Sequence, residues 1–152
     1  VVSSNLAKRA TATNLNSDVA YIDCGKADVT ISADVVMTNT YGVYLIARMA
    51  SASASDSIGA YLDVTGQVMV VKRIAGSSTI LGNTTFAYTA GSIVSCVFSC
   101  KGNDFKIYIN GVLKASVTDD NALKANTRCG MQINLFSSSV EYDYIDNFTV
   151  KG

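Results

Sequence analysis

Tyrosine, arginine and aspartate side chains recur on segments of this chain that alternate between apolar and polar residues. Side chains of these types can hold a sugar, because aromatic faces cover its C–H surfaces and planar polar groups pair with its hydroxyls. The predicted strands 42–50, 58–64, 67–74 and 106–110 point them away from their more apolar sides. The candidate carbohydrate-binding residues are Tyr44, Arg48, Tyr61, Asp63, Arg73 and Tyr108, with Lys106 beside them.

These residues form one site only if several of their strands lie side by side in one sheet. Tyrosine is also common in ordinary strands. The same residues would otherwise form a solvated sheet face, or a surface covered by a neighbouring subunit. The sequence leaves these interpretations open.

Other kinds of site are restricted by composition. The chain has no histidine, which excludes Ser-His and Cys-His nucleophile pairs and histidine metal ligands. Calcium would need several oxygen ligands from loops. Asp119 and Asp120, followed by Asn121, form the best such cluster, and Asp56 is another loop candidate. Their spacing matches no EF-hand loop, so we predict no cofactor and keep calcium at these residues as an alternative.

The four cysteines divide into two groups. Cys96 and Cys100 lie on one predicted strand, roughly 13 Å apart at the usual strand rise, which is too far for a disulfide bond. We predict that they are small core residues. A bridge between Cys24 and Cys129 remains open, and no CxxC spacing indicates zinc.

Charge and hydropathy limit the partners. The chain carries 12 basic and 12 acidic residues, so no net field attracts it to nucleic acid or anionic lipid. No apolar run approaches the ~18 residues of a membrane span. We therefore predict no nucleic-acid partner and no membrane insertion.

The elements that must position the candidate residues are short strands. The stretch 92–117 predicts a three-stranded meander, in which Asn110-Gly111 suits a type I′ hairpin turn. Turns recur every eight to twelve residues along the rest of the chain, which indicates about eleven strands. We predict an all-β fold, an antiparallel two-sheet jelly-roll sandwich over 18–152, preceded by a polar lead-in or linker over 1–17.

The order of the strand motifs resembles the concanavalin A-like lectin/glucanase superfamily, in particular its laminin-G-like modules. The motifs are Asp28-Val-Thr-Ile31, Ala47-Arg-Met-Ala50, Lys72-Arg73 before Ala75-Gly76, Ile107-Tyr-Ile-Asn-Gly-Val-Leu113, Val117-Thr-Asp-Asp120 and Ile145-Asp-Asn-Phe-Thr-Val150. The resemblance implies a flatter and a more curved sheet, whose concave side or rim loops often bind glycans.

Catalysis would require paired carboxylates. Glu141, Asp143 and Asp146 resemble the E-x-D-x-x-E strand of family sixteen glycoside hydrolases, with Asp in place of the final Glu. The shorter Asp side chain spoils the roughly 5 Å carboxyl separation of a retaining enzyme. The chain also has no tryptophan to line sugar subsites. We predict no catalytic residues and no enzymatic activity.

The predicted function is a noncatalytic carbohydrate-binding or recognition module of a larger secreted or virion surface protein. The first residue is Val rather than Met, and we expect a piece of a longer polypeptide, located outside the cell or on a virion. The alternative is a structural decoration or assembly module of a viral particle or bacterial surface structure, without sugar binding. In that case the partners would be neighbouring virion subunits or copies of the same chain.

Overall fold

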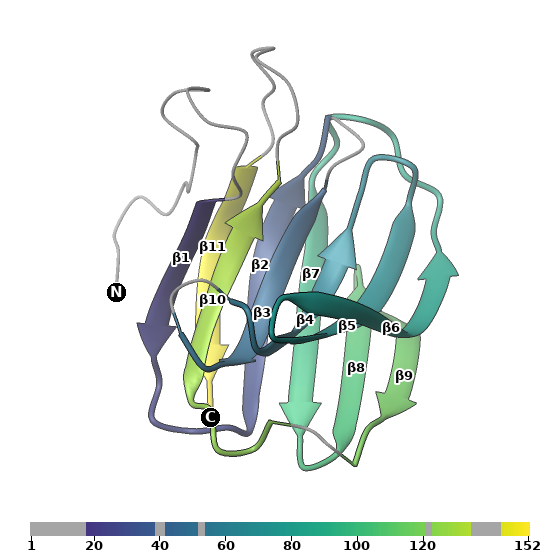
Figure 1. The fold of residues 1–152 in the computed structure, drawn as a ribbon. Helices are drawn as coiled ribbons and strands as arrows, with labels where there is room; N and C mark the ends of the chain where they lie inside the picture. Colours follow the sequence, from purple (N-terminus) through teal and green to yellow (C-terminus); the bar gives the residue numbers. More distant parts are fainter. Residues whose placement is uncertain (1–17, 39–41, 52–53, 121–122, 135–143) are drawn as a thin grey trace.

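The computed structural model describes residues 18–38, 42–51, 54–120, 123–134 and 144–152 (Figure 1). The predicted lead-in 1–17 lies outside the described residues. Within them, no helix is long and apolar enough to cross a membrane. The strands are β1 (Asp18–Asp23), β2 (Val29–Val36), β3 (Val43–Met49), β4 (Ser57–Leu62), β5 (Gln67–Ile74), β6 (Ser77–Thr85), β7 (Val94–Lys101), β8 (Asp104–Ile109), β9 (Val112–Thr118), β10 (Arg128–Ile133) and β11 (Tyr144–Lys151).

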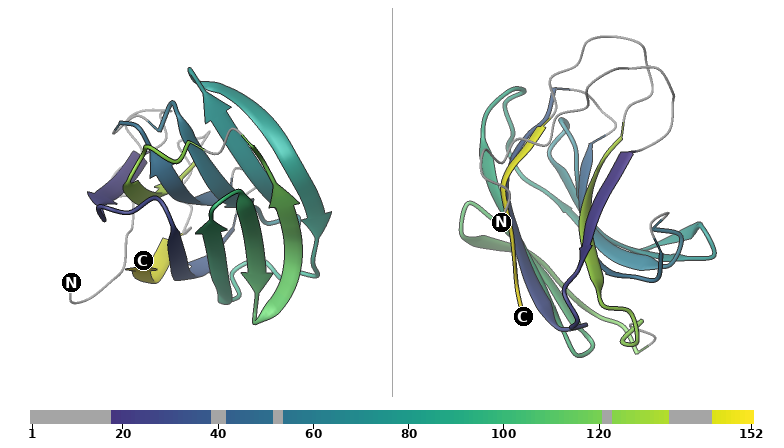
Figure 2. Two further views of the ribbon diagram at one scale, coloured as in Figure 1. Left: turned by 90° about the horizontal axis from the view of Figure 1, so that it is seen from below. Right: turned by 90° about the vertical axis from the view of Figure 1, so that its left-hand side faces the viewer.

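The strands form two sheets that pack face to face (Figure 2). The six-stranded sheet has the order β1-β10-β3-β4-β5-β6, and the five-stranded sheet has the order β11-β2-β7-β8-β9. The paired strands are antiparallel throughout both sheets. The predicted all-β jelly-roll sandwich is therefore confirmed.

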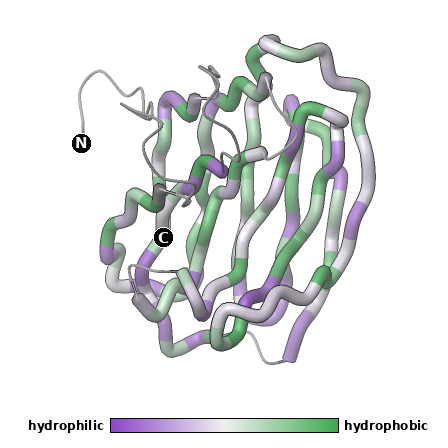
Figure 3. Tube along the Cα trace, turned by 45° about the horizontal axis from the view of Figure 1, so that its top comes forward, coloured by the Kyte–Doolittle hydropathy of each residue, from purple (hydrophilic) through white to green (hydrophobic). Residues whose placement is uncertain are grey.

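Alternation of apolar and polar residues builds the core between the sheets. In β2, the apolar residues Val29, Ile31, Ala33 and Val35 are buried, while Thr30, Ser32 and Asp34 between them are partly exposed. Successive side chains of a strand point to opposite faces, so this pattern fixes which face turns inward. Figure 3 shows apolar and polar positions along the chain trace of both layers, and β7 and β8 alternate in burial as β2 does. Cys96 and Cys100 are fully buried in this core, as predicted.

The predicted meander corresponds to β7, β8 and β9. Asn110 and Gly111 adopt φ angles of 50° and 78°, the positive values that a type I′ turn requires at both central positions. The Asn110 side chain also fixes the turn against β7, because its Oδ1 accepts a hydrogen bond from the Ser95 amide at 3.0 Å.

A β-bulge interrupts the alternation in β3. Met49 pairs with Arg128 and Ile46 pairs with Gly130, so Ala47 and Arg48 together oppose a single residue of β10, Cys129. Arg48 has a φ angle of 52°. An extra residue in a strand reverses the faces of the residues that follow it. Arg48 therefore turns inward, and Met49 joins Ile46 on the outer side, where both pack with Ala54.

Two ion pairs connect the sheets at their margins. Arg48 of β3 pairs with Asp28, which precedes β2, and Lys72 of β5 pairs with Asp119, which follows β9. The β7–β8 turn lies between them, because the Gly102 amide donates to Asp28 Oδ1 and the Asn103 carbonyl accepts from the Asp119 amide.

Candidate functional site

The outer face of the six-stranded sheet brings two of the predicted tyrosines together. Tyr44 of β3 lies directly opposite Tyr61 of β4. Their ring centroids are 4.8 Å apart, with the ring planes inclined by 51°. Paired residues on neighbouring strands point to the same face, so the two rings form a continuous aromatic surface on the side away from the core.

Arg73 joins this surface from β5. Its backbone pairs with Ser57, so the side chain must run along the face past Gly59 to reach Tyr44. The guanidinium carbon lies 4.5 Å from the centroid of the Tyr44 ring, in the geometry of a cation–π contact. Gly59 has no side chain, and a Cβ atom there would lie 3.5 Å from the Tyr44 ring.

A polar chain from β10 holds the arginine in place. Arg73 Nη1 donates a 2.9 Å hydrogen bond to Gln132 Oε1. Gln132 Nε2 in turn donates to Asn134 Oδ1 at 2.7 Å. A guanidinium has five N–H donors, and one of them is used by Gln132. No ion pair involves Arg73 among the residues that the structure describes. Its remaining donors can therefore pair with hydroxyl or carboxylate oxygens of a ligand.

Exposure separates the residues that can touch a ligand from those that support them. Tyr61 and Gln132 are only 8% and 4% exposed, whereas Tyr44 and Arg73 are half-buried. Tyr44 and Arg73 thus present the accessible part of this surface. Tyr61 and Gln132 position them from below and from the side.

Asp63 has a local structural role. Its Oδ1 accepts hydrogen bonds from the Thr65 amide, the Thr65 hydroxyl and the Gln67 amide, which closes the turn between β4 and β5. Its Oδ2 accepts the Tyr61 hydroxyl at 3.1 Å. Burial, and then the nearby Asp63 charge, raise the pKa of Tyr61 well above its usual value. Tyr61 therefore stays a neutral donor to the Asp63 carboxylate.

Two joined loop segments project beside the outer face of the six-stranded sheet. The β5–β6 hairpin end and the loop before β4 are joined, because the Gly76 amide donates to the Ser55 carbonyl at 2.9 Å and the Ala75 amide donates to Asp56 Oδ1 at 2.6 Å. This joined segment, 54–56 with 74–77, extends outward from the six-stranded sheet (Figure 2, right view). We call it the ledge. It covers Ile46 and Met49, since Ala54 is buried against them.

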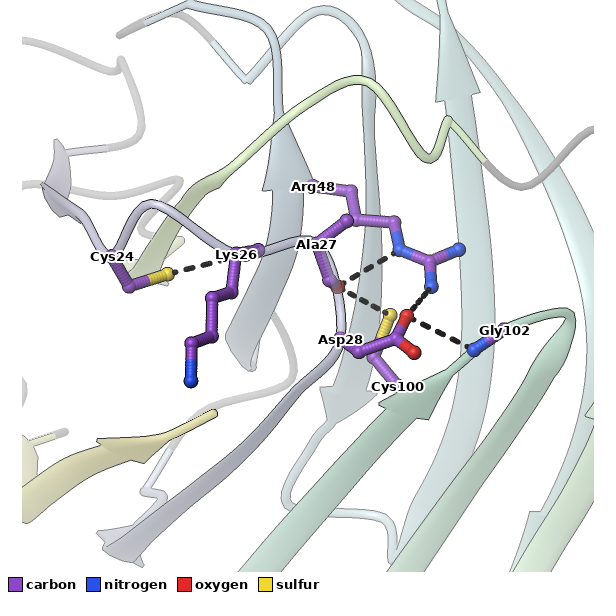
Figure 4. A network of polar contacts seen from close by, with 7 residues as sticks. All are labelled: Cys24, Lys26, Ala27, Asp28, Arg48, Cys100 and Gly102. Atoms are coloured by element: carbon purple, nitrogen blue, oxygen red, sulfur yellow. Dashed lines mark hydrogen bonds and ion pairs between the residues drawn. The ribbon is translucent and has the colours of Figure 1, made fainter.

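Arg48 does not belong to the site, contrary to the sequence prediction. The bulge in β3 turns it into the sandwich, where it is 1% exposed. Its Nε donates to the Ala27 carbonyl at 3.0 Å and its Nη2 lies 2.8 Å from Asp28 Oδ1 (Figure 4). The guanidinium carbon also lies 5.3 Å from the Phe105 ring centroid. Arg48 is a core cross-link between the sheets.

Tyr108 and Lys106 are also placed apart from the other candidates. Both lie on β8, which belongs to the five-stranded sheet. Tyr108 pairs with Val97 and Leu113. It lies on the outer face of that sheet, because its neighbours Ile107 and Ile109 fill the core. The expectation that these strands share one surface is therefore wrong for β8.

Sequence reasoning missed Gln132 and Asn134. Gln132 lies in β10 and Asn134 directly follows that strand, about 90 positions after Tyr44, and the sheet order β10-β3-β4-β5 brings them beside Arg73. One signal was present: Gln132 is the polar residue between the apolar Met131 and Ile133. A polar residue inside an apolar strand usually needs a buried partner.

The described residues of the calcium candidate and of the glycosidase-like motif have partners within the protein. The Asp119 carboxylate pairs with Lys72, and Asp120 Oδ1 accepts a hydrogen bond from Asn103. Across the described ranges, no group of three or more Cys, Asp or Glu side chains could hold a metal ion. Asn121, Glu141 and Asp143 lie outside these ranges. Asp146 is within them, and its Oδ1 accepts the Asn147 amide at 2.7 Å.

Comparison with known proteins bears on the fold. No protein-family model matches the sequence, and no curated protein matches it. The carbohydrate binding module CBM66 from Bacillus subtilis superposes with a TM-score of 0.72 at 15% identity, over 99% of this chain and 92% of that one. The galectin LEC-6 of Caenorhabditis elegans gives 0.66 at 10% identity, over 99% and 95%. The chain has the concanavalin A-like fold.

Enzymes share the concanavalin A-like fold as well. The β-glucanase of Bacillus licheniformis superposes with a TM-score of 0.62 at 13% identity, over 82% of this chain and 65% of that one. Fold similarity at this level of identity does not transfer an activity.

Proposed function

We propose that this chain is a noncatalytic carbohydrate-binding module, and that Tyr44 and Arg73 on the outer face of the six-stranded sheet contact the glycan. One observation carries the proposal: the Arg73 guanidinium lies 4.5 Å from the Tyr44 ring centroid. This places an aromatic face beside a planar donor. The ring would cover the C–H surface of a sugar, while the free N–H groups of Arg73 would donate to its oxygens.

The supporting residues make this surface rigid before a ligand arrives. Gln132 fixes the guanidinium, and Tyr61 supports the Tyr44 ring from the neighbouring strand. Residues held in place before binding lose little conformational entropy when the ligand arrives. The ledge borders the same face and would limit the directions in which a long glycan could extend.

The context we propose is a larger secreted or virion surface protein. Superposition with a carbohydrate binding module and with a galectin supports the binding function. The noncatalytic assignment rests on the described residues, where Asp63 and Asp56 are both engaged in turns. Neither carboxylate is free to act as an acid or a nucleophile beside the aromatic pair.

A glycan array followed by affinity electrophoresis tests the proposal. We expect saturable binding that falls at least about tenfold, which corresponds to 1.4 kcal/mol, in Tyr44→Ala and in Arg73→Met. Tyr108→Ala is the matched control, because it removes a tyrosine from the opposite side of the molecule. Circular dichroism spectra establish that each variant is folded. Equal binding by all variants, or a loss in Tyr108→Ala alone, would contradict the assignment to this face.

One observation favours the structural alternative. Val112 and Leu113, adjacent at the start of β9, are 57% and 48% exposed, and contiguous exposed apolar side chains are typical of association surfaces. An assembly module would form a stable oligomer, without saturable glycan binding. Light scattering coupled to size-exclusion chromatography of the wild type and of Val112→Ser measures this directly. Incubation with a panel of polysaccharides completes the test, since any released product would refute the noncatalytic assignment.

A further inference from the structure

Two thiols from distant parts of the chain meet beside the first turn of the sandwich. Cys24 Sγ lies 2.7 Å from Cys129 Sγ, although the residues are 105 positions apart. A disulfide bond is about 2.05 Å long, so the sulfur atoms need to approach by less than about 1 Å to bond. Cys24 follows β1, and Cys129 lies in β10 opposite the bulge of β3.

The backbone around the pair is fixed by contacts that do not involve sulfur. Ile22 of β1 pairs with Cys129 in the sheet. The Cys24 amide donates to the Thr127 carbonyl at 3.2 Å, and the Thr127 hydroxyl donates to Asp23 Oδ1 at 2.7 Å. The two cysteines are therefore held next to each other by the strand pairing, and formation of a bond requires no rearrangement of the chain.

We propose that Cys24 and Cys129 are a disulfide-forming pair, oxidised by small-molecule disulfides such as glutathione disulfide, and that the bond fastens edge strand β1 to β10. Cys96 and Cys100 remain thiols. This inference is independent of glycan binding, and it applies to the protein in any oxidising environment.

The reaction proceeds by two thiol exchanges. Cys24 is partly exposed and Cys129 is fully buried, so the Cys24 thiolate attacks glutathione disulfide first. One glutathione leaves as a thiol, and a mixed disulfide remains on Cys24. The Cys129 thiolate then attacks Cys24 Sγ and displaces the second glutathione. In total, the protein loses two thiol hydrogens and two electrons, and glutathione disulfide is reduced to two molecules of glutathione.

Burial raises the pKa of the Cys129 thiol, and its hydrogen bond with Cys24 raises it further. The thiolate is the attacking species in each exchange. We therefore expect the second exchange to accelerate as pH rises above neutrality, while the pairing of the cysteines stays the same.

The other pairings are less favourable. Cys96 and Cys100 project inward from the same strand four residues apart, a spacing of roughly 13 Å along β7. Cys100 Sγ points to the Ala27 carbonyl at 3.7 Å (Figure 4). Burial raises the pKa of Cys96 and of Cys100 to about 12, and it also raises the pKa of Cys129, so distance rather than acidity distinguishes the pairings. Cys100 is nevertheless the competitor that the experiment must distinguish, because it faces the same core from the opposite sheet and acts electrostatically on Cys129.

The bond would act on the edge of the six-stranded sheet. Among the strands that the structure describes, β1 is hydrogen-bonded to β10 alone, and an edge strand held by one neighbour opens more easily than a central strand. A cross-link over about one hundred residues restricts the unfolded chain strongly. We expect oxidation to raise the midpoint of thermal unfolding by roughly 10 °C and to slow amide exchange in β1.

The experiment uses the folded protein in glutathione redox buffers. Thiols are trapped with N-ethylmaleimide, and intact mass and peptide mapping count and locate the disulfides. We expect the oxidised protein to retain two of its four thiols and to yield one cross-linked peptide pair containing Cys24 and Cys129. The variant Cys24→Ser, at a partly exposed position, should retain all three of its thiols and show no change in thermal midpoint on oxidation.

Two results would overturn the proposal. One is the recovery of four free thiols from folded protein in a buffer of glutathione disulfide without glutathione. The other is a peptide that joins Cys129 to Cys100 in the wild type. A non-reducing gel of the same samples separates the intramolecular bond, which leaves a monomer, from links between molecules, which would also contradict the assigned pairing.

Discussion

Arg48 shows how one added residue changes the role of a side chain. Strict alternation would put it beside Tyr44 on the outer face, yet the bulge places its guanidinium inside the sandwich. A charged group removed from water must recover its hydrogen bonds from the protein. The Ala27 carbonyl and the Asp28 carboxylate provide them, and the Phe105 ring lies against the guanidinium.

Replacement of Arg48 by methionine should destabilise the fold. The variant keeps most of the apolar volume but removes the Nε donor to the Ala27 carbonyl and the link to Asp28. We expect the free energy of unfolding to fall by about 3 kcal/mol, measured by urea denaturation. Lys101→Met, at an exposed end of β7, is the control and should change stability by less than about 0.5 kcal/mol. Equal effects of the two substitutions would refute the cross-linking role.

The buried hydroxyl of Tyr61 should make the folded protein lose stability at alkaline pH. Burial raises the folded-state pKa of Tyr61 above the value of 10.0 that an ordinary tyrosine has. The unfolded chain therefore releases this proton first as pH rises. The stabilisation is complete below pH 10 and declines above it, by up to about 1.4 kcal/mol per pH unit while only the unfolded state is ionised.

The variant Tyr61→Phe isolates this contribution. Urea denaturation at pH 9, 10 and 11 should give a steeper decline for the wild type than for the variant. The lost hydrogen bond to Asp63 shifts the whole curve of the variant. Phenylalanine has no proton to release, so the slope of the variant lacks the contribution of Tyr61. Parallel curves would contradict a raised pKa.

At the scale of elements, close approach between β1 and β10 depends on Gly130. A Cβ atom at this position would lie 2.4 Å from the Ala20 carbonyl oxygen, which is much closer than non-bonded atoms can approach. At Gly59 in β4, the nearest backbone atom would be the Leu45 carbonyl oxygen at 3.1 Å, a contact that a small shift relieves.

Gly130→Ala should therefore displace edge strand β1. We expect a loss of about 2–3 kcal/mol in the free energy of unfolding and faster amide hydrogen exchange across β1. Gly59→Ala is the milder comparison. It should lower the free energy of unfolding, measured by urea denaturation, by less than Gly130→Ala does. The structural explanation fails if exchange in β1 is unchanged, or if Gly59→Ala is the more destabilising substitution.

The elements also show what the sequence could and could not predict. Local signals were sufficient for the meander, since Asn110-Gly111 specifies its own turn, and for the inward faces of β2 and β7. The bulge in β3 left no local signal, because Arg48 adopts its conformation through pairing with distant β10. Strand β6 (Ser77–Thr85) forms by pairing with β5, which the local sequence does not indicate. Residues such as Thr84 and Thr85 carry no apolar periodicity of their own.

The candidate site was predicted only in part, because local signals identify some of its residues and pairing between distant strands brings in the others. Tyr44, Tyr61 and Arg73 come from strands that follow one another and pair as neighbours in the sheet. Tyr108 was assigned to their surface because alternation identifies a face of a strand but not the sheet that contains it. Gln132 reaches the site through the pairing of β10 with β3, which depends on the connections of the whole chain.

At the scale of the molecule, one hydrophobic core serves both sheets. It combines residues of the six-stranded sheet, such as Leu45 and Leu62, with Phe98 and Ile107 of the five-stranded sheet. Neither sheet can bury its apolar face without the other. The two sheets should therefore unfold together.

We accordingly expect a single cooperative transition in urea, with a slope of about 2 kcal/mol per molar. The chain contains no tryptophan, so tyrosine fluorescence is the tertiary probe and far-ultraviolet circular dichroism is the secondary-structure probe. The two curves should coincide. Separate midpoints would indicate that one sheet persists without the other.

The two ion pairs beside the β7–β8 turn have a mechanical consequence. Apolar contacts between sheets have no preferred direction, so they resist separation of the layers but only weakly resist sliding. Arg48 with Asp28 and Lys72 with Asp119 are directional, and both adjoin the turn that contains Gly102 and Asn103. At this end of the sandwich the two sheets are therefore held in a fixed position relative to each other. Thermal motion of one sheet relative to the other should be smallest at the end with the ion pairs. The separation between the sheets should vary most at the opposite end.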